Sequence, residues 1–462
     1  MTEQALETAA AHATQFLRGL AERPVAASAG AEELRARLGG ALPDGPSDPA
    51  EVVAQLAKLA DDGLVASAGP RYFGFVVGGS LPAALAADWL ASAWDQNAGL
   101  FALGPAAATV EDIAANWLLD LLGLPSTASA GFVTGGQMAS FAGLAAARHA
   151  VLAGVGWDVE RDGLVGAPPV EVVVGAERHV TIDAALRFLG LGSGRVRVVP
   201  ADDQGRMDAA ALPEALAACA GPTIVCAQAG NVNTGAVDPL PAICAAAHDH
   251  GAWVHVDGAF GLWAAASPAR RHLVAGVEEA DSVATDAHKW LNVPYDSGLV
   301  FVAHPEAHRA AFATVAGYLT PGRTGERDPD AFTPEFSRRA RGLPVWAALR
   351  SLGRAGVAEL VERCCGHARR FADLLGAADG VEVLNEVVLN QVLVRFADPG
   401  GDSDGRTREV IRRVQEDGTL WLSGTTWHGV AAMRISVSNW STTTDDVDRA
   451  AAAILAAARE AS

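Results

Sequence analysis

Lysine is almost absent from this 462-residue chain. Its Lys and Arg residues total 35, and reading the sequence shows only two lysines, Lys58 and Lys289. Positive charge is scarce as well, and the net charge of −19 argues against nucleic acid or an anionic membrane surface as a partner. No apolar run reaches the length of a membrane helix, and the first residues lack the basic start and apolar core of a signal peptide. We therefore expect a cytoplasmic protein.

Cysteine and tyrosine are also few. The five cysteines are odd in number, two of them are adjacent, and no CxxC pair occurs, so neither a disulfide framework nor a metal site is indicated. The three tyrosines are Tyr72, Tyr295 and Tyr318. Half of the residues are apolar, and the chain is long enough to bury a large core, so we expect a globular protein.

Short β-rich runs alternate with Ala-rich helical patterns in the middle of the chain. The runs lie at 131–136, 170–177, 195–202, 223–230, 252–258, 281–287 and 297–303. This alternation predicts an α/β fold with a mostly parallel sheet covered on both faces. Three further strand-like runs follow at 381–385, 391–397 and 431–439. The predicted organisation is an N-terminal helical segment (1–68), in which Ser47 or Asp48 caps a helix, a large domain (69–344) and a smaller C-terminal α/β domain (345–462).

Lys289 lies in TDAHKWLNVPYDSG (285–298), between His288 and Trp290. A primary amine can lose its proton when buried and form a Schiff base with a carbonyl, whereas a guanidinium cannot. Lys58, in contrast, lies in an amphipathic helical pattern, and the role of a solvated surface residue suffices for it. A structural explanation is also the simpler one for an isolated His-Lys pair. The rest of the chain has to decide.

Three other signals follow predicted strands, and ligands of parallel sheets bind at the carboxyl ends of strands. GFVTGGQMASF runs from a strand through Gly135 and Gly136 into a helix, whose backbone N–H groups can hold a phosphate. Asp257 is the residue before the last in AWVHVDG, at the end of the predicted strand, and His179 lies just after VEVVVGAE. Each signal also has a purely structural explanation. The glycines could simply end a strand, Asp257 could cap a helix, and His179 could have a structural role. Together with Lys289 they match pyridoxal 5′-phosphate, which needs an amine, a buried carboxylate for its ring nitrogen, an anion nest and a flat neighbour.

These motifs also carry a family resemblance. With HVDGA upstream of Asp-x-His-Lys, the chain from about Arg71 to Asp448 resembles the pyridoxal-phosphate-dependent decarboxylases of aromatic amino acids, tyrosine and glutamate. The resemblance implies a fold type I, PLP-dependent transferase-like homodimer with its sites at the subunit interface. It implies that Lys289 binds the cofactor aldehyde, that Asp257 pairs with the ring nitrogen, and that His179 and Ala259 flank the ring. Further cofactor contacts are expected from Gly135, Gly136, Gln137, Met138, Asn231, Asn233, Asp286 and His288.

The resemblance also implies a substrate site. Arg434 matches the arginine that meets the substrate carboxylate, while Tyr72, Phe73, Phe75 and Phe101 fall where the family builds its side-chain pocket, with Tyr295 as a further candidate. These aromatics favour an aromatic or apolar L-amino acid, which would lose its carboxylate as CO2 to give the amine.

Two departures from the family pattern stand out. Asp286 occupies a position where several relatives have Asn, and the loop 319–336 lacks the tyrosine that returns a proton to the α-carbon. Decarboxylation coupled to oxidative deamination, which gives an aldehyde, therefore stays open. Transamination and retro-aldol cleavage also stay open, as does a binding or scaffold protein without catalysis.

Overall fold

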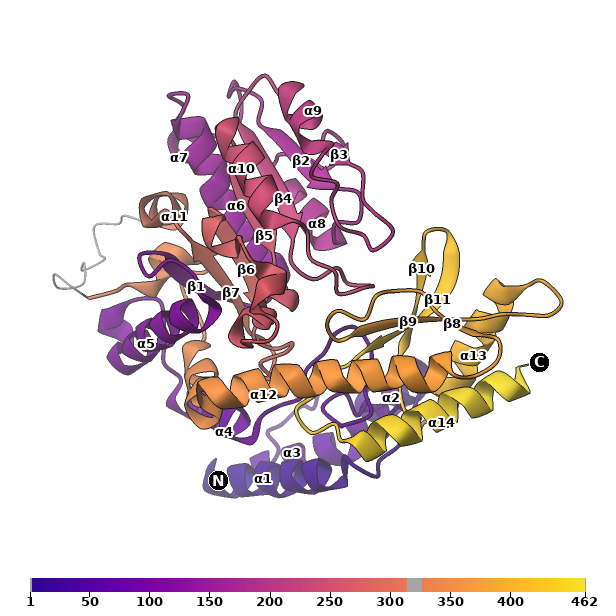
Figure 1. Cartoon of the computed structure of the whole chain (residues 1–462). Coiled ribbons are helices and arrows are strands. Elements are labelled where there is room, and N and C mark those ends of the chain that lie inside the picture. Colours follow the sequence, from indigo (N-terminus) through magenta and orange to yellow (C-terminus); the bar gives the residue numbers. More distant parts are fainter. Residues whose placement is uncertain (1, 314–325, 462) are drawn as a thin grey trace. The chain divides into compact units, whose positions relative to one another are not determined.

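The computed structural model describes residues 2–313 and 326–461 (Figure 1). Its contacts divide the chain into two compact units. The first unit consists of Met1–Val77, Arg370–Leu384 and Leu393–Ser462, and the second of Gly78–Arg369 and Asn385–Val392. The N-terminal helices therefore share a unit with the C-terminal region. The predicted division at residues 68 and 344 cuts the chain elsewhere and stays a prediction.

The second unit is built on a mixed sheet, which has seven strands within the described residues. Its order is β1-β7-β6-β5-β4-β2-β3; β2 to β6 pair in parallel, and β7 runs antiparallel to β1 and β6. All seven runs predicted as strands in this part of the chain are confirmed. The strands are β1 (Ser129–Val133), β2 (Glu171–Gly175), β3 (Arg197–Val199), β4 (Thr223–Gln228), β5 (Trp253–Asp257), β6 (Ser282–Asp286) and β7 (Gly298–Val302).

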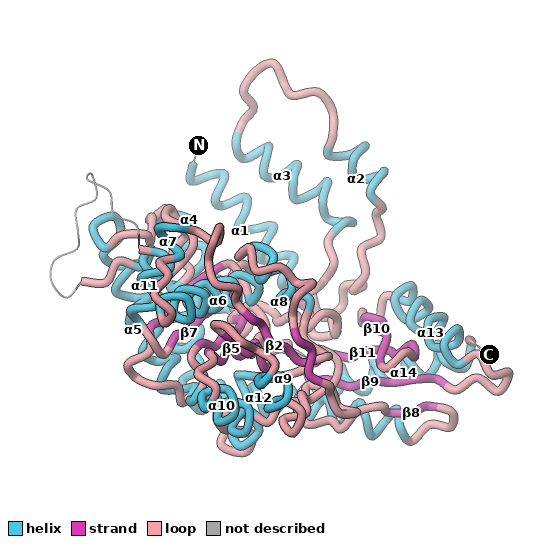
Figure 2. Tube along the Cα trace, turned by 90° about the horizontal axis from the view of Figure 1, so that it is seen from above, coloured by secondary structure: helices cyan, strands magenta, loops and turns pink. Residues whose placement is uncertain are grey.

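Helices cover both faces of this sheet, as the near-continuous apolar strands predict (Figure 2). α6 (Gly136–Ala153) and α8 (Val180–Phe188) pack in one apolar cluster with alternate strand residues such as Val172 and Val174. The intervening Val173 is buried as well, and α10 (Leu240–Asp249) contacts β4 and β5. Two covered faces leave the ends of the strands as the place where ligands can enter.

The remaining helices of the second unit surround this core. They are α4 (Pro82–Trp94), α5 (Pro105–Leu122), α7 (Val159–Asp162), α9 (Leu212–Ala217) and α11 (Pro305–Phe312), with short 3₁₀ helices η2 (Phe101–Leu103), η3 (Gly261–Ala266), η4 (Arg271–Val274), η5 (Val277–Glu279) and η6 (Pro329–Phe332). α12 (Gly342–Gly376) has residues in both units, and its backbone leaves helical geometry at Gly353, where φ is +62°.

The first unit combines helices with a small antiparallel sheet. Asp48 caps α3 by accepting the N–H groups of Ala50 and Glu51, which confirms one of the two predicted caps. The sheet order is β10-β11-β9-β8, and β10 was missing from the prediction. The elements are α1 (Thr2–Gly19), α2 (Ala31–Leu38), α3 (Pro49–Ala60), η1 (Asp61–Gly63), β8 (Val381–Val383), β9 (Gln391–Phe396), α13 (Ser403–Asp417), β10 (Ser423–Trp427), β11 (Val430–Ser436) and α14 (Thr444–Glu460).

All five cysteines are free and buried. Burial raises the pKa of the thiols of Cys226, Cys244, Cys364 and Cys365 to about 12, and it also raises that of Cys219. These thiols are core residues. In the part of the chain that the structure describes, no helix has both the length and the hydropathy needed to cross a membrane.

Candidate active site

Two neighbouring parallel strands bring the central residues to one edge of the sheet. Asp257 is the last residue of β5 and Asp286 the last of β6, with Lys289 three residues further on. The register pairs Asp257 with Ala284, so both carboxylates lie at the carboxyl ends of their strands. This is the edge at which parallel sheets bind ligands.

Lys289 is held by contacts on two sides. Its Nζ lies 2.9 Å from Oδ2 of Asp286. Gly78 packs against its backbone so closely that a Cβ at position 78 would lie 1.9 Å from the Lys289 carbonyl oxygen. The next residue, Gly79, donates its N–H to Oδ1 of Asn292 at 2.7 Å. The sequence prediction missed this support, for which the Gly78-Gly79 pair was the available signal.

Asp257 is a buried carboxylate among positive groups. Its side chain accepts the N–H of Ala259 at 3.2 Å, and the residue is 5% exposed. Burial raises its pKa, while the nearby His179 and Lys289 lower it. Since an unpaired buried carboxylate is costly, a positively charged group beside Asp257 would stabilise its ionised form.

His179 and Asp257 line one small cavity, together with Cys226 and Gln228. His179 is also the N-cap of α8, and its Nδ1 lies 2.7 Å from Oγ1 of Thr181. His179 therefore has the structural role considered for it, since it caps a helix. This role also fixes the orientation of the imidazole ring, which a residue that stacks on a flat ligand requires.

The N-terminus of α6 begins with two residues that have no side chain, Gly135 and Gly136, and we call these two residues the cradle. Gly135 precedes the helix and Gly136 is its first residue, with its N–H donated to Oδ1 of Asp286. A Cβ at Gly136 would lie 2.6 Å from Oδ2 of Asp286. On the sheet side, a Cβ at Gly298 would lie 2.5 Å from the Gly135 backbone. Glycine at position 136 thus lets an anion approach this helix N-terminus closely, and in this structure the Asp286 carboxylate does so.

His288 borders the same cradle. Its Nε2 lies 3.3 Å from Oδ1 of Asp286, and its Nδ1 accepts the N–H of Ser297 at 3.2 Å. Tyr295 lies over the imidazole with a distance of 4.4 Å between ring centroids. Burial lowers the pKa of His288, against the opposing effect of Asp286.

Asn231 shapes its own loop. Its Oδ1 accepts the N–H groups of Asn233 and Thr234 at 2.8 and 3.2 Å, and its Nδ2 donates to the Glu177 carbonyl at 3.4 Å. These bonds use the Asn231 side chain to hold the backbone of the loop beside the segment that carries His179. An Asx turn of this kind is recognisable from an Asn in a loop, although its partner at Glu177 is not.

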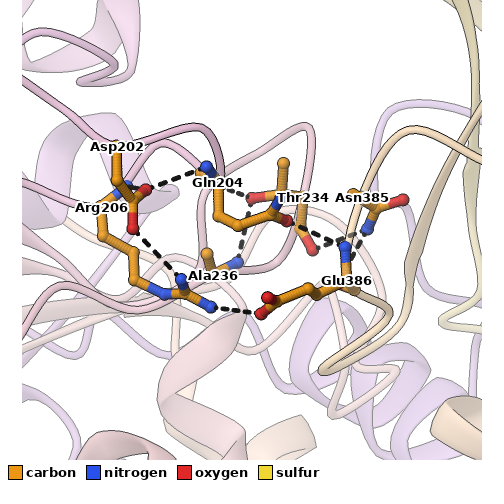
Figure 3. Close-up of polar contacts among 7 residues, drawn as sticks. All are labelled: Asp202, Gln204, Arg206, Thr234, Ala236, Asn385 and Glu386. Atoms are coloured by element: carbon orange, nitrogen blue, oxygen red, sulfur yellow. Dashed lines mark hydrogen bonds and ion pairs between the residues drawn. The ribbon is translucent and has the colours of Figure 1, made fainter.

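Figure 3 shows the hydrogen bonds that join this loop to other segments of the chain. Thr234 donates to the Gln204 carbonyl at 2.7 Å, and Asn385 donates to the Thr234 carbonyl at 3.1 Å. Arg206 pairs with both Asp202, at 3.2 Å, and Glu386, at 2.8 Å. Segments far apart in the sequence therefore fix the loop, which the sequence prediction missed.

Comparison with known proteins gives this arrangement a family. The pyridoxal-dependent decarboxylase conserved domain matches residues 32–397. This chain belongs to the pyridoxal-dependent decarboxylase family. An aromatic-L-amino-acid decarboxylase from Bacillus atrophaeus is 28% identical over 454 residues, which cover 96% of this chain and 92% of the relative. A 4-hydroxyphenylacetaldehyde synthase from Rhodiola rosea is 26% identical over 427 residues, covering 89% and 85%.

A solved structure is similar along the whole chain of this decarboxylase. The crystal structure of Oryza sativa TDC with PLP and tryptamine has a TM-score of 0.92 at 26% identity, and the match covers 99% of this chain and 98% of that one. The predicted PLP fold type I is thereby confirmed. The chain is a pyridoxal-phosphate-dependent amino acid decarboxylase.

The residues at the sheet edge fit this cofactor in three respects. An amine, a buried carboxylate and a helix N-terminus lie at one edge, as an aldehyde, a ring nitrogen and a phosphate require. Glycine is needed at positions 136 and 298, because a Cβ there would collide with the Asp286 carboxylate and with the Gly135 backbone. One residue fits less simply, because Asp286 places a negative charge at the helix N-terminus.

The candidate substrate residues of the decarboxylase are divided between the two units. Phe101 and Tyr295 belong to the second unit, with Lys289. Tyr72, Phe75 and Arg434 belong to the first unit, where Tyr72 stacks on Trp421 at 5.2 Å, Phe75 also packs on Trp421, and Arg434 is buried on β11. The substrate pocket that combines them stays a prediction.

The segment without a tyrosine is described from residue 326 onward; Tyr318 and 319–325 lie outside the described residues. Pro329 and Phe332 are both buried in η6, and the Phe332 ring packs edge-on against His308 at 5.2 Å. Burial, together with the charge of Asp328, raises the pKa of Asp330. The described part of the loop therefore offers a carboxyl group and no phenol as a proton donor.

Proposed function

We propose that this decarboxylase acts on an aromatic L-amino acid and releases the amine and CO2. The observation that carries the proposal is that the Lys289 amine, three residues after β6, and the buried Asp257 carboxylate at the end of β5 lie at one edge of the sheet. The aromatic substrate is supported by the relatives named for aromatic amino acids and by the aromatic residues expected near the site.

Each residue has a defined task in this proposal. When bound, pyridoxal phosphate supplies an electron sink for the pair of electrons left on the α-carbon as CO2 departs. Lys289 binds the cofactor aldehyde, and Asp257 holds a proton on the ring nitrogen. His179 stacks on one face of the ring, and Ala259 lies against the other. The backbone of Gly135, Gly136, Gln137 and Met138 holds the phosphate, with Asn231, Asn233, Asp286 and His288 around the cofactor.

The substrate is oriented by groups outside the sheet edge. Arg434 binds the α-carboxylate, while Tyr72, Phe75, Phe101 and Tyr295 surround the side chain. The family resemblance further supports a homodimer with its sites at the subunit interface. The cytoplasmic location expected from the sequence stays a prediction.

Arg434→Ala should raise the KM for the amino acid by about ten- to a hundredfold, because hydrogen bonds to charged groups contribute ~1.5–3 kcal/mol. Cofactor affinity should change little. Steady-state kinetics and a cofactor titration measure the two effects separately. Arg395→Ala is the matched control, since Arg395 lies on the adjacent strand β9 and pairs with Asp404 at 2.9 Å. A fall in cofactor affinity with an unchanged KM would show that the two anion sites have been exchanged.

A second candidate function is supported by the missing phenol. Without a strong proton donor at the α-carbon, O2 can compete, and the amino acid, O2 and H2O would give an aldehyde, CO2, NH3 and H2O2. The described loop has Pro329 and a buried Phe332 where the prediction sought a tyrosine, and one relative is named as an aldehyde synthase.

Incubation with a panel of L-amino acids decides between these functions. We expect the aromatic members to be consumed fastest, with aldehyde, NH3 and H2O2 released in equal amounts for the share of turnover that escapes protonation. Amine, aldehyde, NH3 and O2 uptake are measured in the same reaction. Rapid and pure amine formation without O2 uptake would show that another acid protonates the α-carbon. Consumption confined to non-aromatic amino acids would refute the proposed substrate class.

A further inference from the structure

A carboxylate of the protein occupies the helix N-terminus that the phosphate is proposed to use. Asp286 is 1% exposed, and its Oδ1 accepts the N–H of Gly136, the first residue of the 18-residue helix α6. Unpaired N–H groups and the helix dipole favour an anion at this point. In this structure, that anion is the side chain of Asp286.

The carboxylate is firmly positioned by its surroundings. The Asp286 backbone N–H donates to the Ala259 carbonyl at 2.9 Å, and its own carbonyl accepts from Nε1 of Trp263 at 3.0 Å. The side chain faces Lys289 at 2.9 Å and His288 at 3.3 Å. The backbone bonds of Asp286 and its contacts with Lys289 and His288 hold the carboxylate beside Gly136 and away from solvent.

We propose that Asp286 competes with the cofactor phosphate for the N-terminus of α6 and thereby weakens the hold of this chain on pyridoxal phosphate. The inference rests on the proposed placement of the phosphate at residues 135–138. An ionised carboxylate only accepts hydrogen bonds, as does a phosphate dianion, so the two groups seek the same donors and repel each other. An asparagine would accept from Gly136 through its oxygen and donate to the phosphate through its nitrogen.

The test compares two ligands in the absence of an amino acid. Pyridoxal 5′-phosphate and pyridoxal carry the same aldehyde and ring, and they differ in the phosphate. Their Kd values are measured by absorbance titration of the cofactor-free protein and of Asp286→Asn. We expect the variant to gain affinity for the phosphorylated ligand, relative to pyridoxal, by about tenfold or more. A change that acted through Lys289 would alter both affinities equally and leave their ratio unchanged.

Asp296→Asn is the matched control. Asp296 is a neighbouring carboxylate that also affects the pKa of His288, but it pairs with Arg341 at 2.8 Å and not with Gly136. Asp286→Ser, which is neutral and smaller, repeats the test if the asparagine variant does not fold. An unchanged ratio in both Asp286 variants, or an equal gain in Asp296→Asn, would overturn the inference. Because no turnover is measured, failure to decarboxylate aromatic amino acids would refute the proposed function and leave this result standing.

Discussion

Lys289→Arg should abolish both turnover and the absorbance band that the cofactor gains when bonded to a lysine amine. The substitution keeps the positive charge next to Asp286 but removes the primary amine, and a guanidinium cannot form the bond to the aldehyde. The spectrum of the purified protein and amine release from the preferred amino acid measure the two losses.

Lys58→Arg provides an unusually clean control for this experiment. Lys58 is the other lysine of the chain, and it is exposed on α3. The control should keep the band and the turnover. Borohydride reduction of the wild type should leave the cofactor attached to the peptide that contains Lys289. An active Lys289→Arg variant that retained the band would refute the assignment of the site.

Asp257→Asn should lower turnover by three orders of magnitude or more, on the order of 4 kcal/mol in the activation free energy. An amide cannot stabilise a positive charge on the ring nitrogen as a carboxylate does. The amide oxygen can still accept the Ala259 N–H, so the local fold should persist. Single-turnover rates and the Kd of the cofactor separate a chemical effect from a loss of binding.

Asp238→Asn is the matched control for the loss of a buried carboxylate. Asp238 is buried in the same unit, burial raises its pKa to about 6, and it accepts the N–H groups of Met207 and Gln228. Its substitution should affect stability more than the rate of the folded protein. A loss of less than tenfold in Asp257→Asn would mean that Asp257 only fixes the Ala259 backbone.

The sequence predicted the structure best where residues that are close in the chain determine a strand or its end. Apolar β-branched runs predicted the strands of the large sheet, and the residues just after β5 and β6 had to lie at one edge because parallel strands end together. β10 was missed because Ser-Gly-Thr-Thr-Trp has few apolar residues and forms an edge strand. It joins β11 through His428 and Gly429, whose φ values of +46° and +84° suit a tight hairpin, but His-Gly is a weak hairpin signal.

Contacts between distant segments were beyond local reasoning. The pair Gly78-Gly79 shows that the backbone needs space, but it does not show that Lys289 fills that space. Likewise, Asp286 was recognised as a departure from the family pattern, while its hydrogen bond with Gly136 depends on how β6 lies against α6. Packing between distant segments, and not any local pattern, brings Gly78 to Lys289 and Gly136 to Asp286.

The buried thiols affect how long this protein would survive its own chemistry. If part of the flux yields peroxide, that oxidant reacts with thiolates far faster than with thiols, and thiols whose pKa is about 12 stay protonated at neutral pH. Met207 and Met433 are buried too, whereas Met138 is only partly buried in the first turn of α6. Among the methionines that the structure describes, Met138 beside the phosphate cradle would thus be oxidised first, and methionine sulfoxide at position 138 would accumulate with oxygen-consuming turnover.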